Sequence, residues 1–277
     1  MQQVTLPSGE KVAALGLGTW QMADSRNKRA DEIATIQLAL DLGMTLLDTA
    51  EMYGEGRAEE LLAEALSGRR DRAFIVSKVY PQNATRKGTV AACERSLKRL
   101  KTDRIDLYLL HWRGSAQLAE ALEGFTELQK AGKIRHHGVS NLDVDDMEEL
   151  WGLPGGKACA TDQVMYSLAH RGMEWNLLPW CRERKMPIMA YCPIDRGDLE
   201  GHRKLNDFAK KHGMSWAQAA LAWLLSKPDI IAIPKTSRPE RLRENHGALK
   251  FKLDKAQLAE LDELFPPPKA ARPLATT

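Results

Sequence analysis

Four residues with side chains suited to acid–base chemistry each follow a short apolar run in this sequence. They are, in order along the chain, Asp48, Tyr53, Lys78 and His111. A tyrosine, whose ordinary pKa is about 10, is a poor proton donor at neutral pH. An ammonium group about 4 Å from the phenol would favour its ionised form by roughly 4 kcal/mol at an effective dielectric constant of about 20. A neighbouring aspartate would hold the ammonium in place while taking back part of this effect. Together these residue types predict a phenol with a lowered pKa that protonates a carbonyl oxygen, and a neutral histidine that orients the carbonyl group.

Each of these residues also has another interpretation when it is considered alone. Asp48 could cap a helix, His111 could be a satisfied core residue, and Lys78 could extend its amine to solvent. Lys78 could also be the Schiff-base nucleophile of a lyase or aldolase, although an aspartate that keeps the amine charged disfavours that chemistry. The choice between these roles depends on whether the strands and helices of the fold bring the four residues together.

Short runs with strand character recur about every thirty residues, which is the length of one strand, one crossover helix and two short loops. Between them, segments such as AEELLAEAL and LAEALEGFTELQKAG carry apolar residues at helical spacing. Eight such units predict one α/β domain over residues 1–277, a (β/α)8 TIM barrel, preceded by an N-terminal β-hairpin turned at Ser8-Gly9. The expected strands are 14–20, 44–50, 73–79, 105–112, 133–141, 161–166, 187–194 and, after a longer interval, 230–235.

A doubly wound open sheet is the competing fold. Such a sheet normally carries the G-x-G-x-x-G phosphate-binding sequence after its first strand. This chain offers only GLGTWQ, in which Gln21 takes the place of the last glycine. The pattern therefore favours the barrel.

Polar and aromatic residues lie at the predicted carboxyl ends of the strands. Barrel enzymes build their active sites at this end, whereas buried parallel strands are otherwise apolar. The gathering of polar and aromatic residues at the carboxyl ends of the strands predicts a functional site there. The residues concerned are Trp20, Asp48, Lys78, His111, Ser140, Asn141, Gln163, Tyr191 and Lys235.

The segment IPKTSRPERLREN, residues 233–245, follows the last predicted strand. Lys235 and Arg241 flank two hydroxyl side chains, and a helix begins beyond them. Barrels often bind phosphate after their seventh and eighth strands, where basic side chains and helix N-termini converge. The segment predicts a site for a phosphate monoester, with a solvated basic turn as the alternative.

Composition excludes several other classes of function. The net charge is only +3 and acids are interleaved with bases, so no nucleic-acid surface is expected. The longest apolar stretch is too short to cross a membrane, and no histidine or cysteine spacing suggests a metal site. Four scattered cysteines and the absence of a signal sequence in MQQVTLPSGE indicate a cytoplasmic protein.

These motifs resemble those of the aldo-keto reductase family over nearly the whole chain. The matching pieces, in the order of the family, are GLGTW, LDTAEMYGEGRAEELLAEAL, IVSK, LLHW, GVSN, DQVMYS, AYCPI and IPKTS followed by Arg241, Glu244 and Asn245. The resemblance implies a barrel that binds NADPH without a Rossmann domain and reduces an aldehyde or ketone by hydride transfer from nicotinamide C4. It also implies that Tyr53 is the general acid, that Lys78 and Asp48 tune it, and that His111 positions the carbonyl.

The resemblance further implies contacts to the cofactor and the substrate, and it favours a monomer acting on a small carbonyl compound. Around the nicotinamide it places Asp48, Ser140, Asn141, Gln163 and the stacking ring of Tyr191. Along the cofactor it places Gly18, Thr19, Trp20, Cys192, Pro193 and Ile194. At the 2′-phosphate and adenine it places Lys235, Thr236, Ser237, Arg241, Glu244 and Asn245. Around the substrate it places Trp20, Met52, Tyr53, His111 and Trp112.

The chain departs from the family pattern at several points. Cys192 stands where many members have serine, and Arg113 follows His-Trp where proline is common. Arg113 could favour acidic substrates or could be an ordinary surface charge. The segments after the fourth and seventh strands are short, as is the tail PPPKAARPLATT, which is expected to be a surface strap or a frayed end. An open, permissive pocket is therefore expected. A nucleotide-sensing protein without turnover is the alternative function.

Overall fold

The computed structural model describes residues 1–25, 28–115 and 117–276. In this part of the chain one parallel sheet of eight strands follows the order of the sequence, each strand hydrogen-bonded to the next. The strands are β3 (Leu17–Gly18), β4 (Leu46–Asp48), β5 (Phe74–Val79), β6 (Ile105–Leu110), β7 (Ile134–Ser140), β8 (Asp162–Met165), β9 (Ile188–Tyr191) and β10 (Ile230–Ala232). All eight predicted strands are confirmed, each shorter than expected.

The first and last strands also pair, which closes the sheet. Parallel bridges join Leu15 to Ala232 and Gly18 to Lys235. The Gly18 N–H donates to the Pro234 carbonyl oxygen at 3.0 Å, and the Ala232 N–H donates to the Ala14 carbonyl oxygen at 2.8 Å. The predicted (β/α)8 barrel is thus confirmed.

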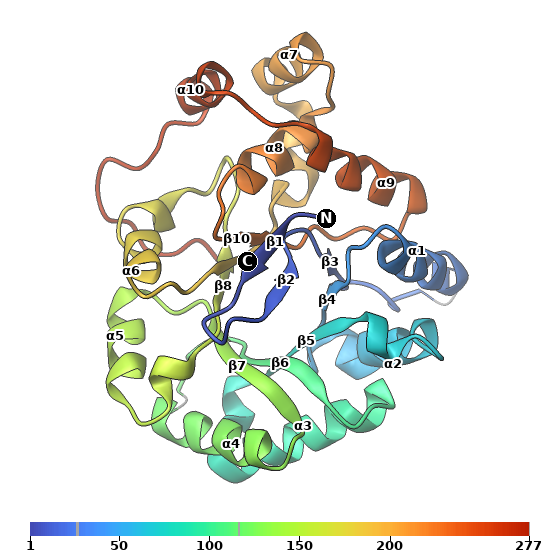
Figure 1. Ribbon diagram of the computed structural model, residues 1–277, viewed down its shortest axis with the longest axis vertical. Coiled ribbons are helices and arrows are strands. Elements are labelled where there is room, and N and C mark those ends of the chain that lie inside the picture. Colours follow the sequence, from blue (N-terminus) through green and yellow to red (C-terminus); the bar gives the residue numbers. More distant parts are fainter. Residues whose placement is uncertain (26–27, 116, 277) are drawn as a thin grey trace.

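Helices surround the barrel (Figure 1). Those of the repeating units are α1 (Arg29–Asp41), α2 (Arg57–Ala65), α3 (Arg86–Leu100), α4 (Leu118–Lys130), α5 (Val144–Gly152), α6 (Leu177–Glu183), α8 (Trp216–Leu225) and α9 (Pro239–Gly247). The short 3-10 turns are η2 (Tyr53–Gly56), η3 (Arg70–Arg72), η4 (Pro81–Asn83), η5 (Gly156–Ala158), η6 (Gly172–Glu174), η7 (Asp195–Gly201) and η8 (Ala248–Lys250). Among the described residues, no helix is long and apolar enough to cross a membrane.

Two further helices lie outside the repeating units, at the top of Figure 1. α7 (Arg203–Lys211) precedes α8 and accounts for the long interval between the seventh and eighth strands, while α10 (Lys255–Leu264) follows α9. Beyond α10 the tail returns to the body of the protein, where Leu274 packs against the core. The tail is therefore a strap as far as Thr276; Thr277 lies outside the described residues.

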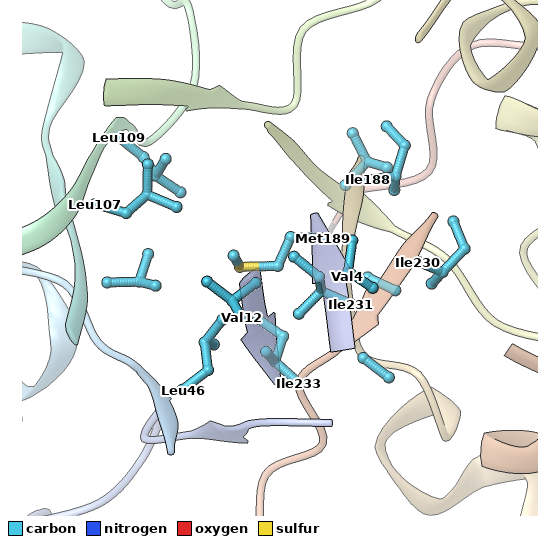
Figure 2. Packing of buried hydrophobic residues seen from close by; sticks show 14 of the residues in the cluster. Val4, Val12, Leu46, Leu107, Leu109, Ile188, Met189, Ile230, Ile231 and Ile233 are labelled. Atoms are coloured by element: carbon cyan, nitrogen blue, oxygen red, sulfur yellow. The ribbon is translucent and has the colours of Figure 1, made fainter. Parts of the chain in front are cut away.

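The predicted hairpin is formed by β1 (Gln3–Thr5) and β2 (Lys11–Ala13). Gly9, with φ +89°, makes the turn, and the Leu6 N–H donates to the Glu10 carbonyl oxygen at 2.8 Å. The hairpin lies across the centre of the barrel in Figure 1. In Figure 2 its buried Val4 and Val12 lie among residues of the barrel core. The side chains of the hairpin thus extend the hydrophobic core of the barrel.

Candidate active site

A cavity of about 930 Å³ opens at the carboxyl ends of the strands. It brings together nearly all of the residues predicted to form the site. Those that line it are Gly18, Trp20, Asp48, Met52, Tyr53, His111, Trp112, Ser140, Asn141, Gln163, Tyr191, Cys192, Pro193, Ile194, Lys235, Thr236, Ser237, Arg241, Glu244 and Asn245. Two predicted residues lie behind this wall: Thr19, whose hydroxyl donates to the Asp48 carbonyl oxygen at 2.9 Å, and Lys78.

Lys78 is fully buried at the end of β5, and its ammonium group has three partners. Its Nζ donates to Asp48 Oδ2 at 2.9 Å, to the Thr49 carbonyl oxygen at 2.8 Å and to the Tyr53 hydroxyl oxygen at 3.1 Å. An ammonium group has three N–H donors, so this set uses all of them. Because Lys78 donates to the phenol oxygen, the proton of Tyr53 is left to point toward another partner.

The pKa of the Tyr53 phenol is raised well above its ordinary value, first by burial of the hydroxyl and then by the charge of Asp48. The prediction of a lowered pKa is therefore wrong. The sequence showed the nearby cation but not the depth of the hydroxyl group, and desolvation outweighs a cation that is itself paired with a carboxylate. Tyr53 consequently holds its proton at neutral pH. Burial also lowers the pKa of Lys78, and the ion pair with Asp48 opposes that shift.

His111 is neutral, as expected. Burial, together with the charge of Lys78, lowers the pKa of its imidazole to about 2. The ring meets Tyr53 edge-on, with 5.8 Å between the ring centroids. Its Nδ1 has no hydrogen-bond partner among the described residues. A neutral ring beside the phenol can therefore bind an uncharged oxygen of a ligand.

The loop after β4 places Tyr53 over the barrel through a left-handed turn. Gly54, Glu55 and Gly56 have φ values of +58°, +57° and +91°. Gly56 also packs closely, because a Cβ atom there would lie 2.4 Å from Arg99 Nε. Arg99 in turn pairs with the fully buried Glu59 at 2.9 Å. Gly54 and Gly56 thus let the loop fold back over the barrel, and the Arg99–Glu59 ion pair packs against the second of them.

Polar residues at the ends of β7, β8 and β9 form a connected network beside Asp48. The Gln163 amide Nε2 donates to Asp48 Oδ1 at 2.7 Å, and the Ser140 hydroxyl donates to the Gln163 carbonyl oxygen at 2.7 Å. The Tyr191 hydroxyl donates to Asn141 Oδ1 at 2.9 Å. This network holds amide and hydroxyl groups in fixed positions next to the Tyr53–Lys78 pair.

The other end of the cavity is basic. Lys235 lines it half-buried, and burial lowers the pKa of its amine. The Arg241 guanidinium is bound by Glu244 at 3.0 Å and by Glu200 at 3.5 Å. Arg238 lines the same wall, and within the described ranges it has no carboxylate partner. Arg238 was not among the predicted residues, although it lies inside the basic segment 233–245 that predicted Lys235 and Arg241.

Arg196, in the loop after β9, also lines the cavity, and no comparable signal in the sequence pointed to it. Cys192, Asp195 and Arg196, after β9, have φ values of +48°, +50° and +53°, and Asp195 Oδ1 lies 3.0 Å from His170 Nε2. The Arg196 guanidinium lies 5.9 Å from the Trp20 ring centroid. These positions follow from the tertiary fold of the β9 loop. The remaining lining residues that were not predicted are Gln21, Gly114, Gly197, Glu200, Trp216, Ala217, Ile233 and Thr276.

Arg113 lines the cavity after Trp112, but its charge is already paired. Its Nη1 is bound to Asp146, and its Nη2 lies 2.6 Å from Glu149 Oε2. Cys192 also lines the cavity, and burial raises the pKa of its thiol to about 11, so it stays protonated. Across the described residues, no group of three His, Cys, Asp or Glu side chains could hold a metal ion.

Comparisons with known proteins agree with this geometry. The profile described as the Aldo/keto reductase family matches residues 14–265. Methylglyoxal reductase YeaE of Escherichia coli strain K12 is 46% identical over 276 residues, covering 97% of this chain and 97% of that protein. Aldo-keto reductase YhdN of Bacillus subtilis strain 168 is 36% identical, covering 85% of this chain and 84% of that protein.

Solved structures give the same result. An aldo/keto reductase from Klebsiella pneumoniae in complex with NADP and acetate has a TM-score of 0.97 and 44% identity, covering 100% of this chain and 99% of that one. An aldo-keto reductase from the same organism in complex with NADPH has a TM-score of 0.96 at 44% identity, with the same coverage. The chain therefore belongs to the aldo/keto reductase family of oxidoreductases.

Proposed function

We propose that this chain is an NADPH-dependent reductase of aldehydes and ketones in which Tyr53 is the general acid. The observation that carries the proposal is the 3.1 Å hydrogen bond from Lys78 Nζ to the Tyr53 hydroxyl in a cavity large enough for a dinucleotide. When bound, the reduced nicotinamide supplies the hydride that adds to the carbonyl carbon. The protein supplies the proton that the carbonyl oxygen takes up.

The side chains divide this task by their protonation states. The substrate oxygen accepts hydrogen bonds from the Tyr53 hydroxyl and the neutral His111 ring. Because its pKa is raised, Tyr53 releases the proton only when negative charge has built up on that oxygen. The Lys78 ammonium then stabilises the phenolate, and Asp48 keeps the amine charged against the effect of burial.

The residues at the cavity walls fit NADPH. We assign Ser140, Asn141 and Gln163 to the carboxamide of the nicotinamide, and Tyr191 to the face of its ring. Asn245 is almost fully buried on the cavity wall, and its Nδ2 lacks a partner in the described structure, which suits it to bind a ring nitrogen of adenine. Gly18, Thr19, Trp20, Cys192, Pro193 and Ile194 would contact the middle of the cofactor. Lys235, Thr236, Ser237 and Arg241 would hold the 2′-phosphate, with Glu244 beside the adenine.

For the substrate, we propose small dicarbonyl compounds such as methylglyoxal, the substrate named for the relative that is 46% identical. Trp20, Met52 and Trp112 provide aromatic and apolar walls around Tyr53 and His111. Met52 is 37% exposed, so the wall is open to solvent on its side. We further propose that the chain acts as a single-domain monomer in the cytoplasm, which sedimentation and cell fractionation would test.

Replacement of Tyr53 by phenylalanine tests the role of the phenol. The Tyr53→Phe variant should lose turnover of methylglyoxal while the dissociation constant for NADPH, measured by fluorescence, stays within about twofold, because the ring is kept and only the hydroxyl is lost. Retained turnover, or loss of NADPH binding, would contradict the assignment.

Replacement of the basic residues tests the choice of cofactor. The double variant Lys235→Ala, Arg241→Ala should bind NADPH much more weakly and NADH almost as well as before, because only NADPH carries the 2′-phosphate. An equal loss for both cofactors would refute the phosphate assignment. Adding Arg238→Ala should weaken NADPH further, since this cation has no carboxylate to offset it.

Two alternative functions are less well supported. A Schiff-base mechanism needs a free amine, whereas Lys78 donates three hydrogen bonds and is paired with Asp48. Borohydride trapping of a substrate adduct on Lys78 would favour that mechanism. A nucleotide sensor without turnover would bind NADPH but fail to oxidise it in a steady-state assay with a panel of aldehydes.

A further inference from the structure

Arg113 lines the cavity two residues after His111, next to the substrate wall formed by Trp112, and its guanidinium group is paired with two acids. Nη1 is bound to Asp146, and Nη2 lies 2.6 Å from Glu149 Oε2. Both acids lie on α5, three residues apart, so they lie on one face of the helix. Two carboxylates and one guanidinium give this group a net charge of −1.

Among the residues that the structure describes, the walls around the reacting position add no positive charge to offset it. The pKa of His111 is about 2, so its ring is neutral, and Lys78 is paired with Asp48 behind the wall. The remaining side chains at this end are aromatic or apolar: Trp20, Met52, Tyr53 and Trp112.

Within the described ranges, the other cations that line the cavity extend from the β9 loop and the segment after β10, which form its nucleotide end. They are Arg196, Lys235, Arg238 and Arg241. Of these, Arg196 reaches toward Trp20. Arg196 is therefore the alternative partner for an acidic substrate and must be included in any test.

Building on the proposed reductase function, we propose that this site selects uncharged carbonyl compounds over those with a carboxylate next to the carbonyl group. Asp146 and Glu149 are the specificity-determining residues, because each pairs with one terminal nitrogen of Arg113 and together they offset its charge. A free guanidinium beside Trp112 would present a bidentate receptor for a substrate carboxylate. With the two acids in place, the same carboxylate meets a cation whose charge is already offset by the two carboxylates paired with it.

The test compares pyruvate with methyl pyruvate, which present the same carbonyl group with and without a negative charge. Wild type should have the higher kcat/KM for the ester. The double variant Asp146→Asn, Glu149→Gln should raise kcat/KM for pyruvate by about fivefold relative to the ester, which corresponds to about 1 kcal/mol for one exposed charge contact. Turnover of the ester should be unchanged in this variant.

Further variants identify the source of the effect. Adding Arg113→Leu to the double variant should abolish the gain for pyruvate, since no cation is then released. Asp145→Asn removes one exposed charge from the same helix without touching Arg113, and it should leave the ratio of the two substrates unchanged. High salt should raise the wild-type ratio of pyruvate to ester, because it screens the repulsion.

The inference is overturned if wild type prefers pyruvate, if the double variant leaves the ratio unchanged, or if Arg196→Ala rather than Arg113→Leu removes the gain. Absence of methyl pyruvate and methylglyoxal turnover in every protein would instead refute the proposed reductase function. Circular dichroism of the double variant checks that α5 is intact. Failure of the specificity proposal can thus be distinguished from failure of the proposed reductase function.

Discussion

Asp162 provides a sharp test of the electrostatics inside this barrel. Its side chain is fully buried, and neither carboxylate oxygen has a hydrogen-bond partner in the described residues. Burial raises the pKa of this carboxyl well above its ordinary value, and the nearby Leu142 backbone N–H only partly opposes the shift. Asp162 is therefore protonated in the folded protein at pH values where the unfolded chain has lost that proton.

The sign and size of the effect follow from proton linkage. Between the unfolded pKa, about 3.9, and the raised folded pKa, the folded state binds one more proton, so stability falls by about 1.4 kcal/mol per pH unit as pH rises. Below the pKa of the unfolded chain, Asp162 is protonated in both states, and its titration does not change the stability. The cost of Asp162 therefore grows with pH at up to about 1.4 kcal/mol per pH unit until the raised pKa of the folded state is reached. Asp162→Asn keeps the shape and removes the titration.

Thermal unfolding of the two proteins between pH 5 and pH 7 measures this effect. The melting temperature of the asparagine variant should rise relative to that of wild type as pH increases, by up to about 3–5 °C per pH unit, at about 2–4 °C per kcal/mol for a chain of this size. Asp103→Asn is the matched control, because it replaces a carboxylate by an amide on a side chain that is 86% exposed; the trend described is expected of the Asp162 variant alone. A difference in melting temperature between the Asp162→Asn variant and wild type that stays constant with pH would refute the reasoning.

Two further predictions concern the support of the Tyr53 loop. Gly56→Ala should lower the free energy of unfolding by about 3 kcal/mol or more, because its Cβ displaces Arg99 from the buried Glu59; urea denaturation would measure it, and a change below about 1 kcal/mol would contradict it. Glu51→Gln should destabilise by about 1.5–3 kcal/mol, since the carboxylate accepts from the Tyr80 N–H at 2.8 Å and faces Arg95 at 3.4 Å. A wild-type melting temperature in that variant would show that the charge is not needed.

The barrel could be predicted from sequence because its signals are local and repeat. The apolar strands and amphipathic helices each leave a pattern within about thirty residues, and polar residues at the strand ends reveal the site. Lys78 and Asp48 were therefore paired correctly although 29 residues lie between them. The positions of Arg238 and Thr276 on the cavity wall depend on how loops fold back, and local patterns do not carry that information.

The direction of the Tyr53 pKa shift could not be obtained from sequence for a different reason. Neighbouring charges can be inferred from spacing, but the depth of a hydroxyl group depends on the packing of the whole barrel mouth. Arg113 shows the same limit, since its two acidic partners come from a helix more than thirty residues away. A sequence thus shows which charged residues could form ion pairs, but only the fold determines which of these charges are paired.

The pairing of β3 with β10 has a consequence for synthesis of the protein. These strands come from opposite ends of the chain, so a growing polypeptide exposes the unpaired edges of β3 and β9 until the last quarter has left the ribosome. Gly18 and Lys235, which face each other across this seam, both border the cavity. The nucleotide cleft is therefore the last part of the barrel to be assembled, and a chain that ends early leaves it unformed.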